Sequence, residues 1–125
     1  VNIGLFCSTP MVAVSRNVSK KRTMEMLLMG NFINANKALD FGLINNVVED
    51  KKLKDETLKI AKNIATKSTA TVAIGKEAFY KQLEMSLEDA YAYTSKVMSS
   101  NMLEKDAQEG ISAFIENRDP IWSDK

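Results

Sequence analysis

The sequence predicts a mostly α-helical chain with one short strand. Apolar residues recur at helical spacing in several segments that begin at capping residues, whereas only residues 43–48 form the short apolar run typical of a strand. A single strand cannot form a sheet of its own, and the helices carry wide apolar faces. We therefore expect the chain to pack against further structure, in a longer polypeptide or in other subunits.

Capping signals place the helices of the first half. Ser19 is a suitable N-cap for a helix over residues 20–29, and Gly30 follows where a helix commonly ends. Asn34 similarly precedes a short helix, which Gly42 closes. The apolar residues before Ser19 include a Ser-Thr-Pro sequence that is expected to interrupt regular structure.

The second half is expected to be helical. A change from acidic to basic residues at positions 49–52 is the best candidate boundary, and it divides the chain into residues 1–50 and residues 51–125. After a first helix that starts near Leu53, the polar stretch 68–71 is expected to interrupt the helical pattern.

Two further helix starts have the spacing of a capping box. Ser86 with Asp89 is one of them, and Asp106 with Glu109 is the other. Since D-x-x-E is a cap spacing, we interpret Asp106 and Glu109 as a helix N-terminus rather than as a catalytic pair. Phe114 lies on the apolar side of the last helix and is expected to be buried.

Composition excludes several kinds of chemistry. The 125 residues contain 17 Lys and Arg against 16 Asp and Glu, so the net charge of +1 gives no reason to expect a nucleic-acid partner. The absence of histidine excludes serine–histidine triads and histidine metal sites, and the single cysteine, Cys7, excludes an internal disulfide. No apolar run approaches the roughly 18 residues of a membrane span, so no membrane partner is expected. The chain begins with Val1 rather than Met, and we expect a partial sequence.

Two motifs resemble those of the enoyl-CoA hydratase/isomerase (crotonase) family. Residues 34–48, NANKALDFGLINNVV, resemble the family pattern A-x-x-A-x-x-x-G-L-V-x-x-V, and residues 106–120, DAQEGISAFIENRDP, resemble D-x-x-E-G-x-x-A-F-x-E-K-R-x-P. Both motifs occur in order and at the family's spacing. The opening residues 1–10, VNIGLFCSTP, are similar to one subgroup of the same family.

The resemblance implies that this chain is the C-terminal half of an α/β crotonase-like fold, the spiral fold shared with ClpP. Residues 1–50 would end the core and form a wall of the acyl pocket, and residues 51–125 would be the helical trimerisation region. Family members polarise an acyl-CoA thioester carbonyl with two backbone N–H groups, which form an oxyanion hole, and move protons with one or two glutamates. These groups belong to family segments before Val1, so we expect no catalytic residue and no activity in this segment alone.

The function implied for the intact protein is hydration or isomerisation of the 2,3 double bond of an enoyl-CoA. The alternative is a non-catalytic crotonase-like protein that binds acyl-CoA or only assembles. The resemblance implies no cofactor beyond the coenzyme A of the substrate, no metal, and self-association as a homotrimer or hexamer. It implies the cytoplasm in a bacterium and the mitochondrial matrix in a eukaryote.

Two groups of residues are candidates for substrate binding by resemblance. The acyl pocket would be lined by Ile3, Leu5, Thr9 and Pro10. Met98 and Asn117 match a phenylalanine and a lysine that hold the CoA adenine in several hydratases. Met98 can still pack on adenine, whereas Asn117 lacks the lysine charge, which the adjacent Arg118 could supply.

Two other features are open to more than one interpretation. The basic cluster of Arg16, Lys20, Lys21 and Arg22 is interpreted first as an exposed helix start, then as a binding site for CoA phosphates, and last as a nucleic-acid contact. Cys7 has no histidine partner, so we expect a buried thiol rather than a nucleophile.

Overall fold

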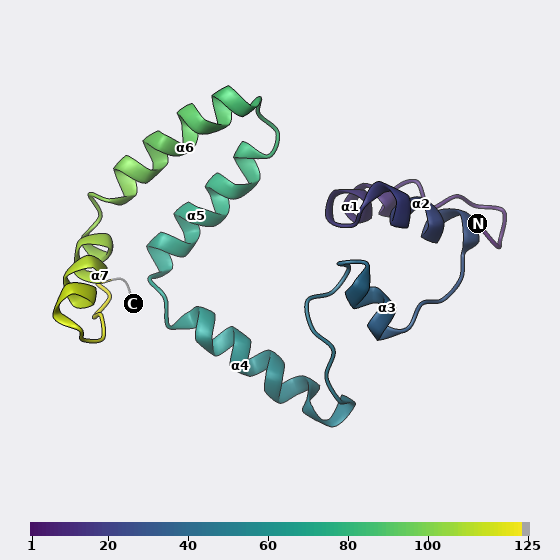
Figure 1. Cartoon of the computed structure of the whole chain (residues 1–125), viewed down its shortest axis with the longest axis horizontal. Coiled ribbons are helices and arrows are strands. Elements are labelled where there is room, and N and C mark those ends of the chain that lie inside the picture. Colours follow the sequence, from purple (N-terminus) through teal and green to yellow (C-terminus); the bar gives the residue numbers. More distant parts are fainter. Residues whose placement is uncertain (124–125) are drawn as a thin grey trace. The chain divides into compact units, whose positions relative to one another are not determined.

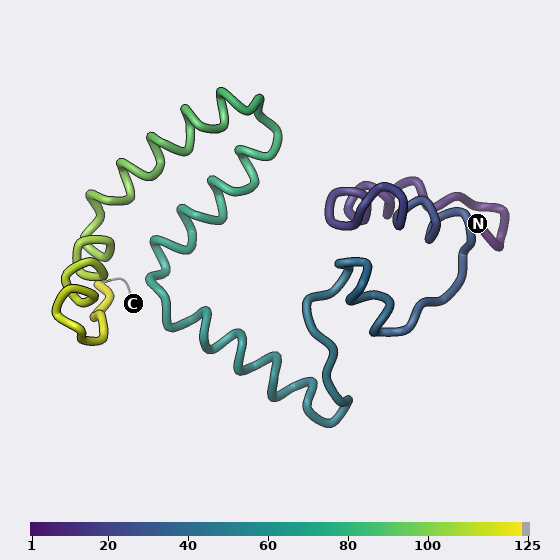
Figure 2. Tube along the Cα trace, in the orientation of Figure 1, coloured from purple at the N-terminus to yellow at the C-terminus, as the bar shows by residue number. Residues whose placement is uncertain are grey.

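The structure is a computed structural model that describes residues 1–123, and these residues form helices joined by short loops (Figure 1). The chain divides into two compact units, Val1–Lys54 and Asp55–Lys125, and each is described separately. Figure 2 follows the Cα trace through both units. Within residues 1–123, no helix has both the length and the apolar character needed to cross a membrane.

The first unit contains three α-helices and one 3-10 turn. They are α1 (Pro10–Asn17), α2 (Lys20–Met29), α3 (Ala35–Asp40) and η1 (Asp50–Lys52). Helix α1 packs against α2. Pro10 opens α1 at a position where a missing backbone N–H costs nothing, so the sequence that was expected to interrupt regular structure starts a helix instead.

The predicted ends of α2 and α3 are confirmed. Gly30 adopts a left-handed φ of 58° directly after α2, as a helix C-terminus favours. The Asn34 side chain caps α3 by accepting a hydrogen bond of 2.9 Å from the Lys37 backbone N–H. Gly42, with a φ of 74°, follows α3.

The predicted strand over residues 43–48 is wrong, because no strand occurs among residues 1–123. A strand needs a neighbouring strand for its backbone hydrogen bonds, and the first unit supplies none. The backbone N–H of Leu43 instead donates to the carbonyl of Ala38, at 2.9 Å, as part of the helix end. An apolar run in sequence therefore predicted a conformation that this chain alone cannot complete.

As far as residue 123, the second unit contains four α-helices. They are α4 (Leu53–Ala65), whose first two residues fall in the first unit, α5 (Thr69–Gln82), α6 (Leu87–Asn101) and α7 (Lys105–Glu116). Helices α5 and α6 run side by side in opposite directions (Figure 1), and α5 also packs against α7.

Serine side chains begin two of these helices. The Ser86 hydroxyl accepts from the Asp89 backbone N–H at 3.2 Å and donates to the Asp89 carboxylate at 2.7 Å, so the predicted cap at the start of α6 is confirmed. The Ser68 hydroxyl accepts from the Thr71 backbone N–H, also at 3.2 Å. The predicted interruption between two helices therefore occurs at residues 66–68, a little earlier than expected, and residues 69–71 are already the first turn of α5.

Three expectations of burial or capping are wrong in this chain. Phe114 is 86% exposed, whereas the neighbouring Ala113 is only 1% exposed, so the buried stripe of α7 passes beside the aromatic ring. The N-cap of α7 is Glu104, which leaves Asp106 inside the first turn. Cys7 is exposed, because it lies in the irregular segment before α1.

Candidate substrate-binding surfaces

The residues expected to line an acyl pocket lie at the start of the first unit. The backbone N–H of Gly4 closes a turn by donating to the carbonyl of Val1 at 3.0 Å, and the Asn2 amide donates to the carbonyl of Gly30 at 2.9 Å. This turn is thus attached to the end of α2. An added Cβ at Gly30 would lie 2.7 Å from the Asn2 side-chain oxygen, so a larger residue there would displace the side chain that makes this attachment.

The turn presents its apolar side chains outward. Ile3 is 83% exposed and Leu5 is 67% exposed. Thr9 and Pro10 form the entry to α1 and are also exposed. The four predicted acyl-pocket residues therefore lie close together along one short segment, with apolar surface available for a further element or ligand.

A compact ionic cluster joins α2 to α3. The Glu25 carboxylate accepts from Arg22 at 2.9 Å and from Lys37 at 3.4 Å. Both cations also lie over the Phe41 ring, at 4.6 Å for the Arg22 guanidinium carbon and 5.2 Å for the Lys37 nitrogen. The hydrogen bond from Arg22 and the nearby Lys37 hold the pKa of Glu25 below its usual range.

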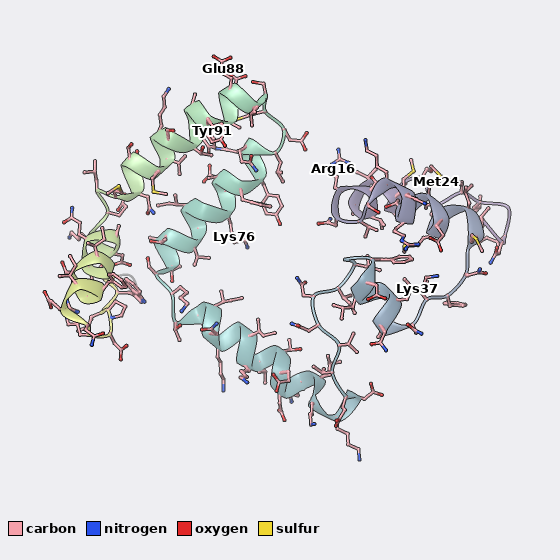
Figure 3. The ribbon with its side chains drawn as sticks, viewed as in Figure 1. Arg16, Met24, Lys37, Lys76, Glu88 and Tyr91 are labelled. Atoms are coloured by element: carbon pink, nitrogen blue, oxygen red, sulfur yellow. The ribbon has the colours of Figure 1, made fainter. Side chains whose placement is uncertain are left out.

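These contacts also bear on the interpretation of the basic residues Arg16, Lys20, Lys21 and Arg22. Arg22 is engaged with Glu25 and Phe41, and Arg16 donates to the carbonyl of Val12 at 3.3 Å. Figure 3 labels Arg16 on α1 and Lys37 on α3 among the other side chains. Two of the four basic residues therefore stabilise helices in the first unit, which agrees with the structural interpretation preferred from sequence.

The corner after α7 brings two predicted CoA-binding residues together. Asn117 adopts a left-handed φ of 54°, and the backbone N–H groups of Asn117 and Arg118 return to the carbonyls of Phe114 and Ala113 at 3.3 and 3.0 Å. These two bonds form a Schellman motif. The corner borders a hollow of about 360 Å³ that is lined by Ala113, Phe114, Asn117, Arg118 and Asp119.

Two carboxylates hold the Arg118 side chain. Glu109 accepts from both terminal nitrogens of the guanidinium, at 2.6 and 3.0 Å, and Glu116 accepts from Nε at 2.6 Å. Glu109 also accepts the backbone N–H of Ile121 at 2.8 Å. The hydrogen bonds from Arg118 and then from Ile121 lower the pKa of Glu109 to about 2, and the same carboxylates raise the pKa of Arg118.

Asp106 has an anchoring role that the capping-box interpretation did not foresee. Asp106 is only 5% exposed. One of its carboxylate oxygens accepts hydrogen bonds from the backbone N–H and the hydroxyl of Ser123, at 2.7 and 2.6 Å. Asp106 and Glu109 therefore hold the segment that follows α7, instead of capping its start. The preference for a structural role over a catalytic one agrees with these contacts, although the predicted contact was wrong.

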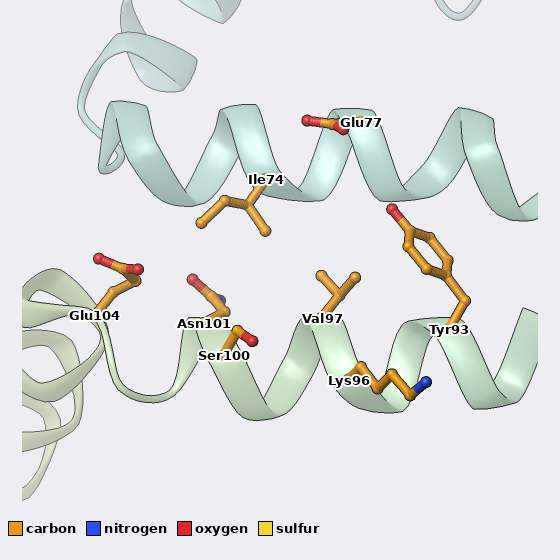
Figure 4. A pocket seen from close by; sticks show the side chains of 8 residues that line it. All are labelled: Ile74, Glu77, Tyr93, Lys96, Val97, Ser100, Asn101 and Glu104. Carbon is orange, nitrogen blue, oxygen red and sulfur yellow. The ribbon is translucent and has the colours of Figure 1, made fainter.

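A shallow groove runs between α5 and α6. Ile74 from α5 and Val97 from α6 face each other across it (Figure 4), and polar side chains border these two residues. Its lining is completed by Glu77, Tyr93, Lys96, Ser100, Asn101 and Glu104. The side-chain oxygen of Asn101 is buried without a hydrogen-bond partner. Within residues 1–123, no group of three or more Cys, Asp or Glu converges in a way that could hold a metal ion.

Met98 does not join the Asn117 corner within one chain. It is 61% exposed on α6, and the hollow beside Asn117 is lined by α7 and the residues after it. Sequence reasoning also missed Trp122, whose indole N–H donates to the carbonyl of Thr66, beyond α4, at 2.7 Å. The available signal was the single tryptophan of the chain, placed just after the second motif.

Comparison with known proteins supplies the family. All 125 residues match the family model described as Enoyl-CoA hydratase/isomerase. The chain belongs to the enoyl-CoA hydratase/isomerase family. Enoyl-CoA hydratase domain-containing protein 3, mitochondrial, from Rattus norvegicus is 51% identical over 123 residues, which cover 98% of this chain and 41% of the rat protein. The resemblance seen in the two motifs and in the opening residues is thus confirmed, and the chain spans about two fifths of the length of this relative.

Solved structures from the same family share the fold. An enoyl-CoA hydratase from Mycobacterium smegmatis matches with a TM-score of 0.93 and 49% identity, over 97% of this chain and 47% of that one. Human enoyl Coenzyme A hydratase domain-containing protein 3 matches with a TM-score of 0.92 and 48% identity, over 97% of this chain and 48% of that one. The helices described above therefore correspond to just under half of a hydratase-family chain.

Proposed function

We propose that this chain is the C-terminal half of an enzyme that hydrates or isomerises the 2,3 double bond of an enoyl-CoA through an oxyanion hole. The observation that carries the proposal is the family match over residues 1–125. Substrate activation falls to the remainder of the intact protein, where backbone N–H groups would stabilise the enolate and glutamates would move the proton. This half contributes substrate-binding surface and subunit contacts.

The adenine end of coenzyme A would bind at the corner after α7. Phe114 offers an exposed ring, and Asn117 offers an amide that can pair with the edge of a purine. Arg118 would order the corner rather than neutralise a phosphate, since the carboxylates of Glu109 and Glu116 already pair with its charge. Met98 would add an apolar contact from α6 of a neighbouring subunit.

The acyl chain would bind against the segment before α1. Ile3 and Leu5 expose apolar side chains, while Thr9 and Pro10 fix the entry to the helix. Burying these apolar groups against an acyl chain is favourable because it removes both surfaces from water. No cofactor other than the coenzyme A of the substrate is part of this proposal.

The intact protein would assemble as a homotrimer, or as a hexamer made of two trimers. Exposed apolar side chains on the second unit support assembly, among them Tyr91, Leu103, Phe114 and Ile115. A three-fold contact pairs two different surfaces and closes as a ring. In a eukaryote the protein would act in the mitochondrial matrix, as the name of the rat relative supports, and in a bacterium it would act in the cytoplasm.

Enzyme assays test the division of labour. The intact protein should consume crotonyl-CoA, which is followed by the loss of enoyl absorbance, whereas the 125-residue chain alone should show no turnover above background. Turnover by the short chain would refute the assignment of catalysis to the remainder. Binding of crotonyl-CoA by the intact protein without turnover would support a non-catalytic role instead.

A truncated substrate tests the adenine site. Phe114→Ala in the intact protein should raise KM for crotonyl-CoA and leave KM for crotonyl-pantetheine, which lacks the adenine, unchanged. Phe79→Ala is the matched control, because Phe79 is also an exposed aromatic residue on a helix of the second unit. An equal rise of KM for both substrates would contradict an adenine site at Phe114.

Light scattering on the intact protein tests assembly. A mass of three or six subunits at micromolar concentration is expected. A stable monomer would contradict both the assembly and the contribution of Met98 from a neighbouring subunit.

A further inference from the structure

The residues after α7 form a strap, which we define as residues 117–123. The Schellman motif at Asn117 reverses the chain, and the strap then returns along α7, where Ser123 reaches Asp106 in the first turn of the helix. Within the strap, the backbone N–H groups of Ile121 and Ser123 donate to carboxylates and not to other backbone groups. Side chains of α7 therefore hold the strap against this helix.

The strap also connects α7 to the turn between α4 and α5. Trp122 donates its indole N–H to the carbonyl of Thr66, which lies 56 residues earlier in the chain. Its ring lies over Gly110, where an added Cβ would be 3.4 Å from two ring carbons. The absence of a side chain at Gly110 thus allows the ring to approach α7 closely, and the ring forms one wall of a hollow that Val72 and Ile111 also line.

We propose that residues 117–123 form a conformational strap that docks and releases as one unit, with Asp106 and Glu109 as its two anchoring residues. The anchors lie three residues apart on α7, so they face the same side of the helix. Glu109 fixes the start and middle of the strap through Arg118 and Ile121, and Asp106 fixes its end through Ser123.

Release of the strap need not break any helix. The bonds that hold it beyond Asn117 and Arg118 involve side chains, whereas α4, α5 and α7 keep their own backbone hydrogen bonds when these contacts open. Opening would expose the Gly110 side of α7 and remove the Trp122 wall from the hollow beside Val72 and Ile111. Docking and release of the strap do not depend on the proposed enzymatic activity.

The only tryptophan of the sequence makes the strap directly observable in the full 125-residue chain. Glu109→Gln and Asp106→Asn should each shift the emission of Trp122 to longer wavelength and increase its quenching by acrylamide. Amide exchange at residues 121 and 123 should become roughly tenfold faster or more, since each substitution weakens charge-assisted hydrogen bonds. The helical circular dichroism signal should stay unchanged.

Glu77→Gln is the matched control. It removes an exposed carboxylate that pairs with Lys81 on α5 and has no contact with the strap, so Trp122 emission should not change. In the unsubstituted chain, residues 121 and 123 should exchange at a common rate that exceeds the rate of the α7 amides, a measurement that needs no variant. Exchange of strap and α7 amides in a single step would overturn the proposal, as would unchanged Trp122 quenching in both Glu109→Gln and Asp106→Asn.

Discussion

Helices α3 and α7 end with the same backbone motif and continue in different ways. After α3, the N–H groups of Gly42 and Leu43 return to the carbonyls of Leu39 and Ala38, both at 2.9 Å. After α7, Asn117 and Arg118 make the equivalent bonds. Beyond the motif, residues 43–49 have no regular structure, whereas residues 117–123 are held by carboxylates.

Reversing the chain after a helix and holding the next segment in place are two separate requirements. The reversal needs only one left-handed residue and two backbone bonds, which both helix ends have. The placement of the following segment needs partners, and only α7 provides them among its own side chains. The stretch after α3 has the composition of a strand, so its partner would be another strand that the first unit lacks.

The aromatic residues beside the two reversals should differ most in their contribution to stability. Phe41 precedes Gly42, is 8% exposed and receives two cations on its ring, whereas Phe114 is 86% exposed. Phe41→Ala should therefore lower the free energy of unfolding of the first unit by about 3 kcal/mol. Phe114→Ala should change that of the second unit by about 0.5 kcal/mol or less in the single chain. Hydrogen exchange of the α2 and α7 amides measures the two effects, and equal losses would contradict the comparison.

The left-handed residue of the first reversal should have the next largest effect. Gly42→Ala places a Cβ at a φ of 74°, and the nearest heavy atom would be 4.0 Å away, so the cost is backbone strain rather than a clash. We expect a loss of about 1–2 kcal/mol from the first unit. Gly75→Ala, within α5 and with open space around it, should be neutral or stabilising under the same denaturation conditions.

The side chains that cap helix N-termini should contribute about equally to the stability of the two units. Asn34→Ala and Ser68→Ala each remove one acceptor from a helix N-terminus, and each should cost about 1 kcal/mol. Ser99→Ala is a suitable control because Ser99 bonds within an exposed helical face. A cost for Ser68→Ala several times that for Asn34→Ala would mean that the start of α5 is held by more than its cap.

The smallest expected effect is the response of the two carboxylate clusters to acid. The pKa of Glu109 is lowered to about 2 by Arg118 and Ile121, and that of Glu25 is lowered mainly by Arg22. A carboxylate whose pKa is lowered in the folded chain stabilises the fold when it is ionised. This stabilisation is fully present above the ordinary pKa of 4.5, and it is lost as pH falls through the pKa of the folded state. Trp122 emission should change below pH 4.5 in the unsubstituted chain, and Glu109→Gln should already show the altered emission at neutral pH. An identical acid response of the two proteins would exclude Glu109 as its source.

Local signals in the sequence predicted the helices well. Asn34, Ser86 and the glycines that follow α2 and α3 were sufficient because caps act within a few residues along the chain. The two motifs predicted the family, which the family model confirms over the whole chain. These features depend on neighbours in sequence or on a repeated pattern, and both are visible without a structure.

Contacts between distant residues could not be predicted in the same way. The spacing of Asp106 and Glu109 fits a capping box, and nothing local indicates that they bind Ser123 and Ile121 instead. The bond from Trp122 to Thr66 joins residues that share no pattern. The prediction of a strand failed for a similar reason, since a strand pairs with a partner that often lies far away in sequence or in another chain.

The left-handed conformation of Asn117 separates what the backbone requires from what the side chain adds. Glycine adopts this conformation without steric cost, so Asn117→Gly would preserve the corner and delete only an amide. Natural variation among relatives can therefore be interpreted at this position. Glycine would mark a corner that only turns the chain, and asparagine would mark a corner whose amide is used.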